Sequence, residues 1–286
     1  MTSSGLETYI HTSSVKGLSS VTTLIVGAKA AVIIDPPFLV PDAKSVVRWV
    51  KEKTSKPLKA LFVTHHHPDH FFSANPILDA FPGSKLFAAP YVLAGINREY
   101  DEKVKFWPTG FGRENIPEVP TKPTVSSTAY SVDHTLFWLP SEKTIICGDA
   151  VYARSTHVWV EEIETKAILE AWYNTLDLIE ALKPEKVIAG HLESGWELDA
   201  KADLAHNRRY LDLFAEKITY AKKKPQVDEL FQTFKAAFPD ADQNLDFFLG
   251  HLSNQFGEGG KVWEENRHHN VGARTKEQLE AYYFRI

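Results

Sequence analysis

The sequence predicts a soluble α/β protein with a helical C-terminal region, and three observations support this fold class. β-rich segments alternate with helical patterns through the first part of the chain. Three of the predicted strands end on side chains that can bind metal, at His65, Asp149 and His191. From about Leu198 onward helical patterns dominate, with breaks at proline and glycine residues.

Composition favours one large domain. The chain has 286 residues, of which 43% are hydrophobic, enough to bury a substantial core. We expect a domain over residues 1–200 and a helical extension over 201–286 that packs on the same domain. The chain has 32 Lys and Arg and 37 Asp and Glu, a formal net charge of -5, and its basic residues do not form a continuous block. Nucleic acid is therefore not an expected partner.

Neither a membrane span nor a disulfide is expected. No stretch approaches the roughly 18 to 20 consecutive apolar residues of a bilayer span, and the N-terminus lacks the features of a signal peptide. We predict a cytoplasmic protein without a membrane partner, possibly a homodimer. Cys147 is the single cysteine and is expected to be a buried thiol. Imidazole and carboxylate groups must therefore bind any metal.

The first elements lead to a histidine run. Residues 21–26 and 30–35 are predicted strands separated by a turn that contains glycine. Asp42 is expected to cap a helix that runs to about Lys53. Residues 58–64 form a predicted buried strand that ends directly on the histidines.

The middle of the chain contains a helix, a loop and a hairpin. Residues 71–81 are predicted to be helical, and 85–89 form a short strand. Residues 107–124 are rich in Pro and Gly without apolar periodicity, which indicates a surface loop. Residues 136–140 and 144–147 flank a short turn and predict a hairpin.

Two more strands end on polar residues. The second hairpin strand ends on Gly148 and Asp149. A helix capped by Thr165 runs to about Leu182, and the strand that follows it ends on Gly190 and His191. In sheets layered with helices, ligand sites gather at the carboxyl ends of strands. We therefore expect these side chains to lie near the histidine run.

The histidine run has the pattern of a metal site. His65, His67 and Asp69 alternate, so their side chains point to one side of an extended segment, and His70 follows where the chain turns into a helix. Imidazoles and a carboxylate within six residues suit Zn²⁺, which binds N and O ligands at about 2.0 to 2.2 Å. A polar loop or a tag would not follow a buried strand or carry an embedded aspartate.

These motifs resemble those of a known family. The run His65-x-His67-x-Asp69-His70 resembles the signature of the metallo-β-lactamase superfamily, and Gly148-Asp149 and Gly190-His191 resemble its later metal motifs. The resemblance extends over about residues 21–195. It implies a four-layer αββα sandwich, with two central sheets between outer helices and a binuclear metal centre at one edge.

The resemblance also implies a ligand set for two zinc ions per chain. The first ion would be held by His65 and His67, the second by Asp69, His70 and His191, with Asp149 bridging both. Manganese or iron would accept the same ligands.

The third ligand of the first ion is open. Many relatives supply it from a Gly-His-Thr-type motif that this chain lacks, and His134, fifteen residues before Asp149, is the nearest candidate. If the alignment is anchored on Leu139-Pro140 instead, the usual position falls near residues 128–130 and His134 lies beside the site. His157 could then complete the coordination or contact the substrate.

Two residues are candidates for catalysis. Asp69 can orient a metal-held hydroxide and receive its proton. Tyr152 lies three residues after Asp149, which resembles the lactone-opening members of the superfamily, where a tyrosine hydroxyl can polarise the carbonyl or assist the leaving group. Packing under the site is the alternative role. Three further residues could line an apolar substrate pocket or belong to the core: Phe106, Trp107 and Phe111.

We therefore expect a zinc-dependent hydrolase that opens a small cyclic ester or amide, a lactone or lactam. A zinc-bound water has its pKa lowered from about 15.7 to about 7, so hydroxide can attack the carbonyl at neutral pH. A thioesterase that resembles glyoxalase II is the alternative, with Arg267, Arg274 and Lys276 as candidates to hold a substrate carboxylate. A redox protein with an iron centre and a non-catalytic member of the fold are less favoured.

Overall fold

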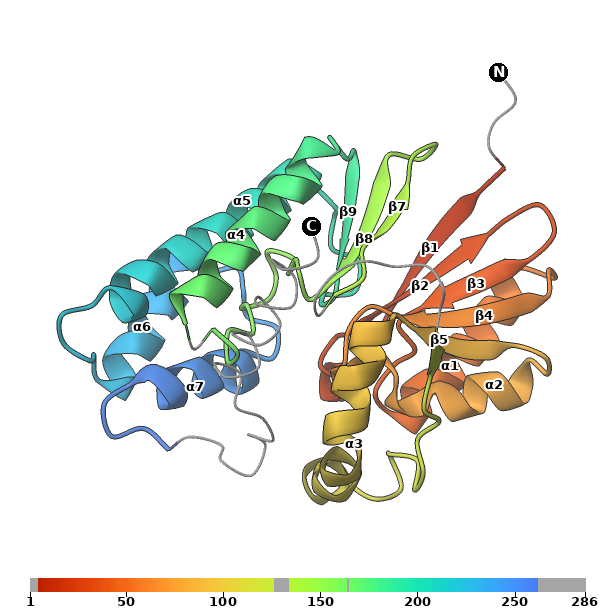
Figure 1. Ribbon diagram of the computed structural model, residues 1–286, viewed down its shortest axis with the longest axis horizontal. Helices are drawn as coiled ribbons and strands as arrows, with labels where there is room; N and C mark the ends of the chain where they lie inside the picture. Colours follow the sequence, from red (N-terminus) through yellow and green to blue (C-terminus); the bar gives the residue numbers. More distant parts are fainter. Residues whose placement is uncertain (1–4, 126–133, 164, 262–286) are drawn as a thin grey trace.

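The protein is built from two β-sheets with helices outside them (Figure 1). The computed structural model describes residues 5–125, 134–163 and 165–261. The first sheet has six strands in the order β1-β2-β3-β4-β5-β6, and the second has three in the order β7-β8-β9. This arrangement is the αββα sandwich that the sequence predicted.

The first sheet combines antiparallel and parallel pairing. Its strands are β1 (Glu7–Thr12), β2 (Val21–Val26), β3 (Ala31–Ile34), β4 (Leu58–Val63), β5 (Lys85–Ala88) and β6 (Thr124–Val125). Strands β1 to β3 pair antiparallel, and β3 to β6 pair parallel. Every residue of β2 is buried because the two faces of this strand contact different hydrophobic clusters.

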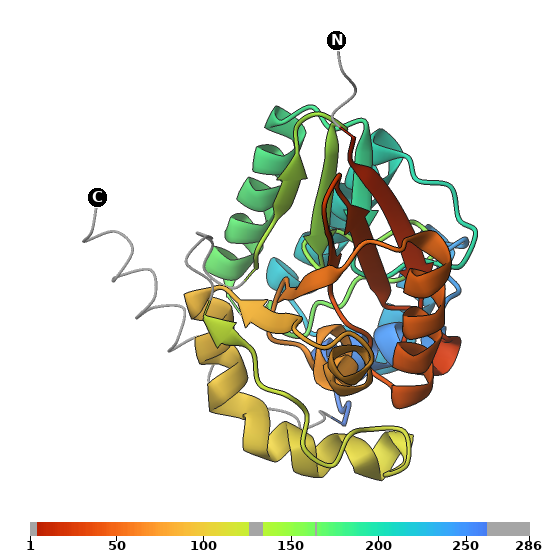
Figure 2. The ribbon, with the colours of Figure 1, turned by 90° about the vertical axis from the view of Figure 1, so that its right-hand side faces the viewer.

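Three helices accompany this sheet: α1 (Val40–Lys53), α2 (Asn75–Ala80) and α3 (Pro90–Phe111). Helices α1 and α3 share one hydrophobic cluster with the sheet, and Figure 2 shows them beside its strands. Asp42 is not the N-cap of α1, as the sequence had suggested, because the helix begins two residues earlier. The Asp42 carboxylate instead accepts hydrogen bonds from the backbone N–H and hydroxyl of Ser14.

The loop predicted to begin at residue 107 is partly helix. Helix α3 continues through Pro108 to Phe111 and ends at Gly112, whose φ of 93° suits glycine. Proline and glycine near the end of a helix gave the appearance of a longer loop. Phe106, Trp107 and Phe111 therefore lie on α3.

These aromatic rings pack in the core of the first half. The Phe38 ring lies 5.4 Å from that of Trp107 and 4.9 Å from that of Phe111, measured between centroids, in edge-on geometry. Phe106 and Phe111 pack against the same cluster, in which Trp107 is buried. Their assignment as lining residues of a pocket in a surface loop was therefore wrong about the loop, and the packing favours the core alternative.

The second sheet and its first helix agree with the sequence. Strands β7 (Phe137–Leu139) and β8 (Thr144–Gly148) form the predicted hairpin, and β9 (Lys186–Ala189) pairs parallel with β8. Helix α4 (Lys166–Ala181) is capped by Thr165, whose hydroxyl accepts from the Ile168 N–H at 3.3 Å. Cys147 is buried in β8, as expected.

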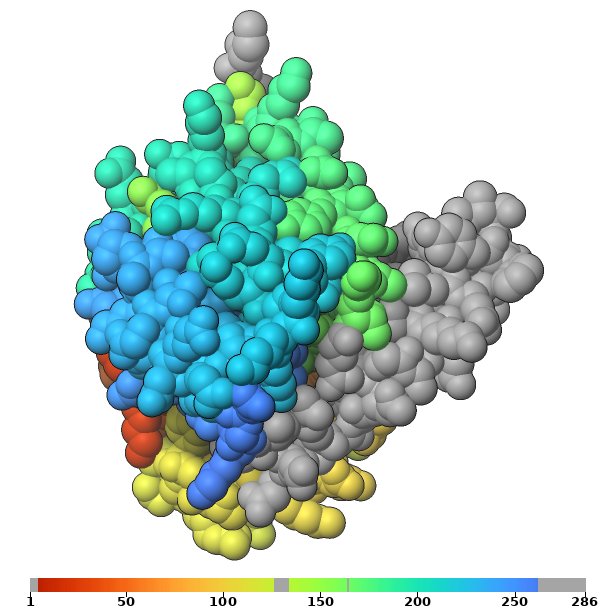
Figure 3. Space-filling model, turned by 90° about the vertical axis from the view of Figure 1, so that its left-hand side faces the viewer, coloured from red at the N-terminus to blue at the C-terminus, as the bar shows by residue number. Residues whose placement is uncertain are grey.

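The C-terminal helices pack on the second sheet. They are α5 (Ala200–Phe214), a π-helical turn η4 (Ala215–Thr219), α6 (Val227–Ala237) and α7 (Leu245–Phe256). Their apolar side chains share one hydrophobic cluster with β8, β9 and α4. In Figure 3 these helices, in cyan and blue, form much of one face of the molecule. Among the described helices, none is both long enough and apolar enough to cross a membrane.

Candidate metal centre

The predicted ligands meet where strands from both sheets end. His65 to His70 follow β4 and include a 3-10 turn, Asp149 follows β8, and His191 comes two residues after β9. The two sheets are joined at this edge, since the Val21 N–H donates to the Gly190 carbonyl at 2.8 Å. Segments that are far apart in the sequence thus converge on one place.

Two glycines allow this close approach. Gly148 has a φ of 51°, and a Cβ there would lie 2.3 Å from the Thr64 hydroxyl oxygen. A Cβ at Gly190 would lie 2.1 Å from Oδ1 of Asp149. Neither position can hold a larger side chain unless its surroundings shift.

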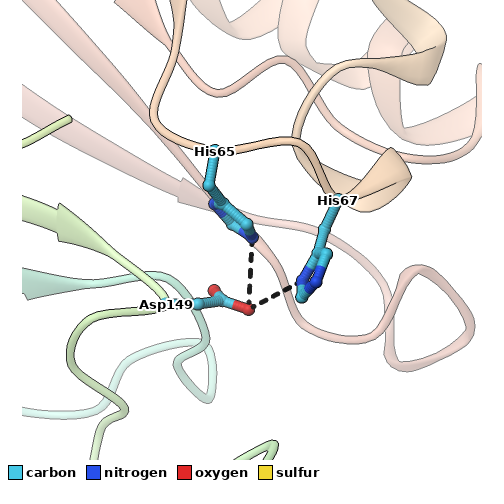
Figure 4. A group of neighbouring side chains, drawn as sticks. All are labelled: His65, His67 and Asp149. Carbon is cyan, nitrogen blue, oxygen red and sulfur yellow. Dashed lines mark ion pairs between the residues drawn. The ribbon is translucent and has the colours of Figure 1, made fainter. Parts of the chain in front are cut away.

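The carboxylate of Asp149 lies between two pairs of imidazoles. Its Oδ2 is 3.5 Å from Nε2 of His65 and 3.6 Å from Nδ1 of His67 (Figure 4). Its Oδ1 is 3.2 Å from Nε2 of His70 and 3.3 Å from Nε2 of His191. Each oxygen of one carboxylate therefore faces its own pair of histidines.

Asp69 completes the second group. Its Oδ2 lies 3.5 Å from Nε2 of His70 and 3.4 Å from Nε2 of His191. Two ligand atoms at about 2.1 Å from a tetrahedral ion are about 3.4 Å apart, which is close to these separations. Two sets of side chains could thus hold a cation: His65, His67 and Asp149, and Asp69, His70 and His191.

Unpaired polar atoms in the centre fit a divalent metal. Nε2 of His65, Nε2 of His70 and Oδ1 of Asp149 are buried without a hydrogen-bond partner among the described residues. A buried polar atom left unpaired costs about 1 to 3 kcal/mol, so several such atoms at one place indicate a ligand. Imidazole and carboxylate donors suit zinc, manganese or iron.

The outer nitrogens of the histidines are held by the protein. Nδ1 of His191 donates to the Leu18 carbonyl at 2.7 Å, and Nδ1 of His70 donates to Oδ2 of Asp35 at 3.0 Å. A histidine whose Nδ1 carries the proton keeps a lone pair on Nε2, the atom that faces Asp149 in both cases. These hydrogen bonds prepare both rings to bind metal.

Asp35 makes several hydrogen bonds at the centre and was not among the residues predicted from the sequence. Its two oxygens accept from the backbone N–H of Thr64 at 2.8 Å and from the Thr64 hydroxyl at 2.7 Å. The same hydroxyl lies 2.9 Å from Nδ1 of His65. Asp35 thus orients ligands of both groups, since it also binds His70. Asp35 is the last residue of the predicted strand 30–35, and this position was the signal that could have identified it.

Burial and neighbouring charges set the protonation of the centre. Burial lowers the pKa of His65 to about 3, so this imidazole is neutral at pH 7. Burial also acts to lower the pKa of His67, but the carboxylates of Glu162 and Asp149 outweigh it and raise that pKa to about 10. Burial alone would raise the pKa of Asp149, but neighbouring imidazoles, that of His191 foremost, hold it well below its usual range. A metal would therefore meet an ionised carboxylate and displace the proton of His67.

Comparison with known proteins agrees with this centre. The sequence model described as the metallo-beta-lactamase superfamily matches residues 15–191, which include every ligand predicted above. The chain belongs to this superfamily. Members of the superfamily are typically metal-dependent hydrolases.

Solved structures of the superfamily share the fold. A metallo-β-lactamase from Hirschia baltica superposes with a TM-score of 0.52 at 14% identity, covering 72% of this chain and 94% of its own. The structure titled VMB-1 at pH 5.5 gives a TM-score of 0.51 at 18% identity, covering 76% of this chain and 96% of its own. At this identity the likeness concerns the fold alone. No curated protein matches the sequence.

His134 lies beside the first group. Its ring stacks on that of His65, with centroids 4.6 Å apart and planes at 14°. Its Nε2 is buried and has no hydrogen-bond partner among the described residues, and burial lowers its pKa to about 3. His134 is in none of the described groups of possible metal ligands, but its neutral ring lies directly against the His65 ring of the first group. The alternative position near residues 128–130 lies outside the described residues.

Tyr152 contacts the central carboxylate directly. Its hydroxyl donates to Oδ2 of Asp149 at 2.7 Å, and its ring stacks on that of His191, with centroids 5.3 Å apart. Its backbone N–H and carbonyl are both bound by the Asn207 side chain of α5, at 3.0 and 2.7 Å. The side chain is fully buried, so it is both packed and connected to the metal centre.

His157 does not belong to the metal centre. Its Nδ1 lies 3.1 Å from the Tyr210 hydroxyl, and its ring packs edge-on against the rings of Tyr210 and Phe238. No described group of possible metal ligands includes it. The chain after Tyr152 enters the hydrophobic cluster of the C-terminal helices, and His157 therefore packs there, outside the described ligand groups.

Two acidic residues approach the remaining histidines. His66 belongs to neither of the two ligand sets described above. Its Nε2 lies 3.5 Å from Oε2 of Glu99 on α3. Glu162 lies 2.6 Å from Nε2 of His67 and forms a third possible ligand group with His66 and His67. The basic residues considered for a thioesterase lie outside the described residues: Arg267, Arg274 and Lys276.

Proposed function

We propose that the protein is a zinc-dependent hydrolase that opens a small cyclic ester or amide, a lactone or lactam. The observation that carries this proposal is the hydrogen bond from Tyr152 to Asp149, the carboxylate that lies between the two ligand groups. This hydrogen bond connects Tyr152 to the metal centre, and lactone-opening members of the superfamily have a tyrosine at the corresponding position.

In this proposal two zinc ions occupy the centre. His65, His67 and His134 would hold the first, Asp69, His70 and His191 would hold the second, and Asp149 would contact both. When bound there, zinc lowers the pKa of a water to about 7 and so supplies the hydroxide that attacks the carbonyl.

The chain itself supplies orientation and proton transfer. Asp69 has an oxygen that faces two imidazoles of the second group, and this carboxylate orients the nucleophile and accepts its proton. Tyr152 has one hydroxyl proton, which it donates to Asp149 in this structure and which would turn to the substrate to polarise the carbonyl or assist the leaving group. A small substrate agrees with the formal charge of -5 and with the lack of a basic block for a polyanion.

The experiment is a metal analysis paired with a substrate screen. Purified protein is analysed for bound metals, and hydrolysis of lactones, lactams, thioesters and phosphodiesters is measured with and without a chelator. We expect about two zinc ions per chain and lactone or lactam opening that the chelator abolishes and added zinc restores. Turnover of thioesters alone would favour the thioesterase alternative. A protein without metal or turnover would overturn the proposal.

A further inference from the structure

His67 differs from the other predicted ligands in the nitrogen that it presents. His65, His70 and His191 approach Asp149 with Nε2, whereas His67 approaches it with Nδ1. The outward nitrogen of His67 is therefore Nε2. It lies 2.6 Å from Oε1 of Glu162, a hydrogen bond between residues 95 positions apart in the sequence.

This contact selects the form of His67 that can bind metal. A neutral imidazole has one N–H, and a carboxylate can only accept a hydrogen bond. Glu162 therefore keeps the proton on Nε2, which leaves the lone pair of Nδ1 directed toward Asp149 and any metal beside it. A charge-assisted hydrogen bond also fixes the rotation of the ring.

The segment that carries Glu162 is anchored to the second half of the molecule. Val160 and Ile163, on either side of Glu162, are 2% and 4% exposed and belong to the hydrophobic cluster of the C-terminal helices. The side chain of Gln255 on α7 donates to the Glu161 carbonyl at 2.6 Å. Glu162 thus extends from a fixed segment to a histidine that follows β4 of the first sheet.

We propose that Glu162 is a positioning residue for the first metal, acting through His67. The inference rests on the proposed metal centre and extends it, since no sequence motif connects this glutamate with the histidine run. Glu162 orients His67 and holds its proton on Nε2, while His67 provides the metal ligand. Because α7 anchors the segment, the C-terminal extension contributes to the first metal position.

The test compares two substitutions in the full-length protein. Metal-depleted samples of Glu162→Ala and Glu162→Gln are titrated with Zn²⁺ against a competing chelator to resolve both binding steps. We expect Glu162→Ala to weaken one step by about 10- to 100-fold, the usual effect of losing an outer partner of a ligating histidine. Glu162→Gln retains an acceptor oxygen and should lose less. The other step should change by less than about twofold.

A spectroscopic measurement distinguishes positioning from simple packing. Nitrogen-15 NMR of labelled histidine compares the two zinc-loaded proteins: the Nε2–H of His67 should be held in a strong hydrogen bond in the unsubstituted protein and should exchange freely with water in Glu162→Ala. Glu185→Gln is a matched control, because Glu185 is exposed and pairs with Lys143 at 2.6 Å. It should leave both zinc affinities unchanged.

The outcomes separate this inference from the proposed function. Unchanged affinity for both zinc ions in Glu162→Ala, in a protein that binds two, would overturn only the role of Glu162. Loss of a whole zinc equivalent in both variants would also overturn it, because Glu162 would then be a ligand itself. Failure of the unsubstituted protein to bind zinc would overturn the proposed metal centre. Circular dichroism of the metal-depleted variants checks that they are folded.

Discussion

The protein contains two groups of buried histidines that differ in their neighbours. In the metal centre, burial lowers the pKa of His65 to about 3. In the second half of the molecule, burial lowers the pKa of His157 to about 3 and that of His206, on helix α5, to about 4. His65, His157 and His206 are thus neutral at pH 7, whereas neighbouring carboxylates raise the pKa of His67 to about 10 and that of His70 well above its usual value. Only the first group surrounds a carboxylate, that of Asp149. His157 and His206 belong to no described set of possible metal ligands.

The difference shows what makes a buried histidine a ligand. Around His157 the partners are a phenol and aromatic rings, and His206 lies 3.2 Å from the Thr156 carbonyl. Such surroundings accommodate a neutral ring. In the metal centre, the ionised Asp149 is 5% exposed and requires positive charge nearby. Burial makes a ring such as that of His65 neutral, and the buried carboxylate favours a cation, which is a metal ion or a protonated imidazole.

The largest effect should come from removing that carboxylate. We expect Asp149→Ala to lose bound metal and nearly all hydrolysis while keeping its fold. Activity should fall by more than about 100-fold, because even outer partners of a ligand contribute 10- to 100-fold. Metal content, hydrolysis rates and circular dichroism check this. His157→Asn, in the other histidine group, should retain its metal; equal metal loss in both variants would contradict the distinction.

A methyl group at residue 190 should displace the same carboxylate. In Gly190→Ala, the new Cβ would lie 2.1 Å from Oδ1 of Asp149, so the carboxylate or the strand end must move. We expect zinc affinity to fall at least about tenfold, with about 1 to 3 kcal/mol of destabilisation from overpacking. Zinc titration and denaturant unfolding measure both.

Gly250→Ala is the matched control. A Cβ at Gly250 would contact nothing within 4 Å, and the residue lies within helix α7. Alanine should therefore stabilise the helix by up to about 1 kcal/mol and leave zinc affinity unchanged. If Gly190→Ala bound zinc as tightly as this control, the close approach at Asp149 would not matter for metal binding.

The sequence predicted the parts of the fold that local pattern determines. Strands β2 to β5 and β7 to β9 and helices α1, α2 and α4 were predicted from local pattern, the C-terminal helices only as a helical region, and the ligand motifs follow strand ends. Residues 90–106 of helix α3 were not assigned to any element, and the end of the helix was predicted as a loop because of Pro108 and Gly110. Asp35 and Glu162 were missed for another reason. Their importance comes from contacts with His70 and His67, 35 and 95 residues away, which no local pattern records.

The contact of Tyr152 with Asp149 leads to a smaller effect on turnover. We expect Tyr152→Phe to lower kcat for lactones by about 10- to 100-fold, as loss of one polarising donor can do. The aromatic ring that stacks on His191 remains, so zinc content should not change. Steady-state kinetics with metal analysis test this. Unchanged kcat would leave Tyr152 with a packing role only.

The second histidine group should affect stability toward acid. The pKa of His157 falls from about 6.5 in the unfolded chain to about 3 in the folded protein. A folded pKa below the unfolded one means that its contribution to stability is complete above pH 6.5 and is lost as the pH falls toward 3. Between pH 7 and 4, metal-depleted His157→Asn should therefore lose less unfolding free energy than the unsubstituted protein, by a few kcal/mol at most. Urea unfolding across this range measures the difference. Parallel curves would mean that the pKa of His157 is the same in the folded protein as in the unfolded chain, and burial would then not be what distinguishes this ring.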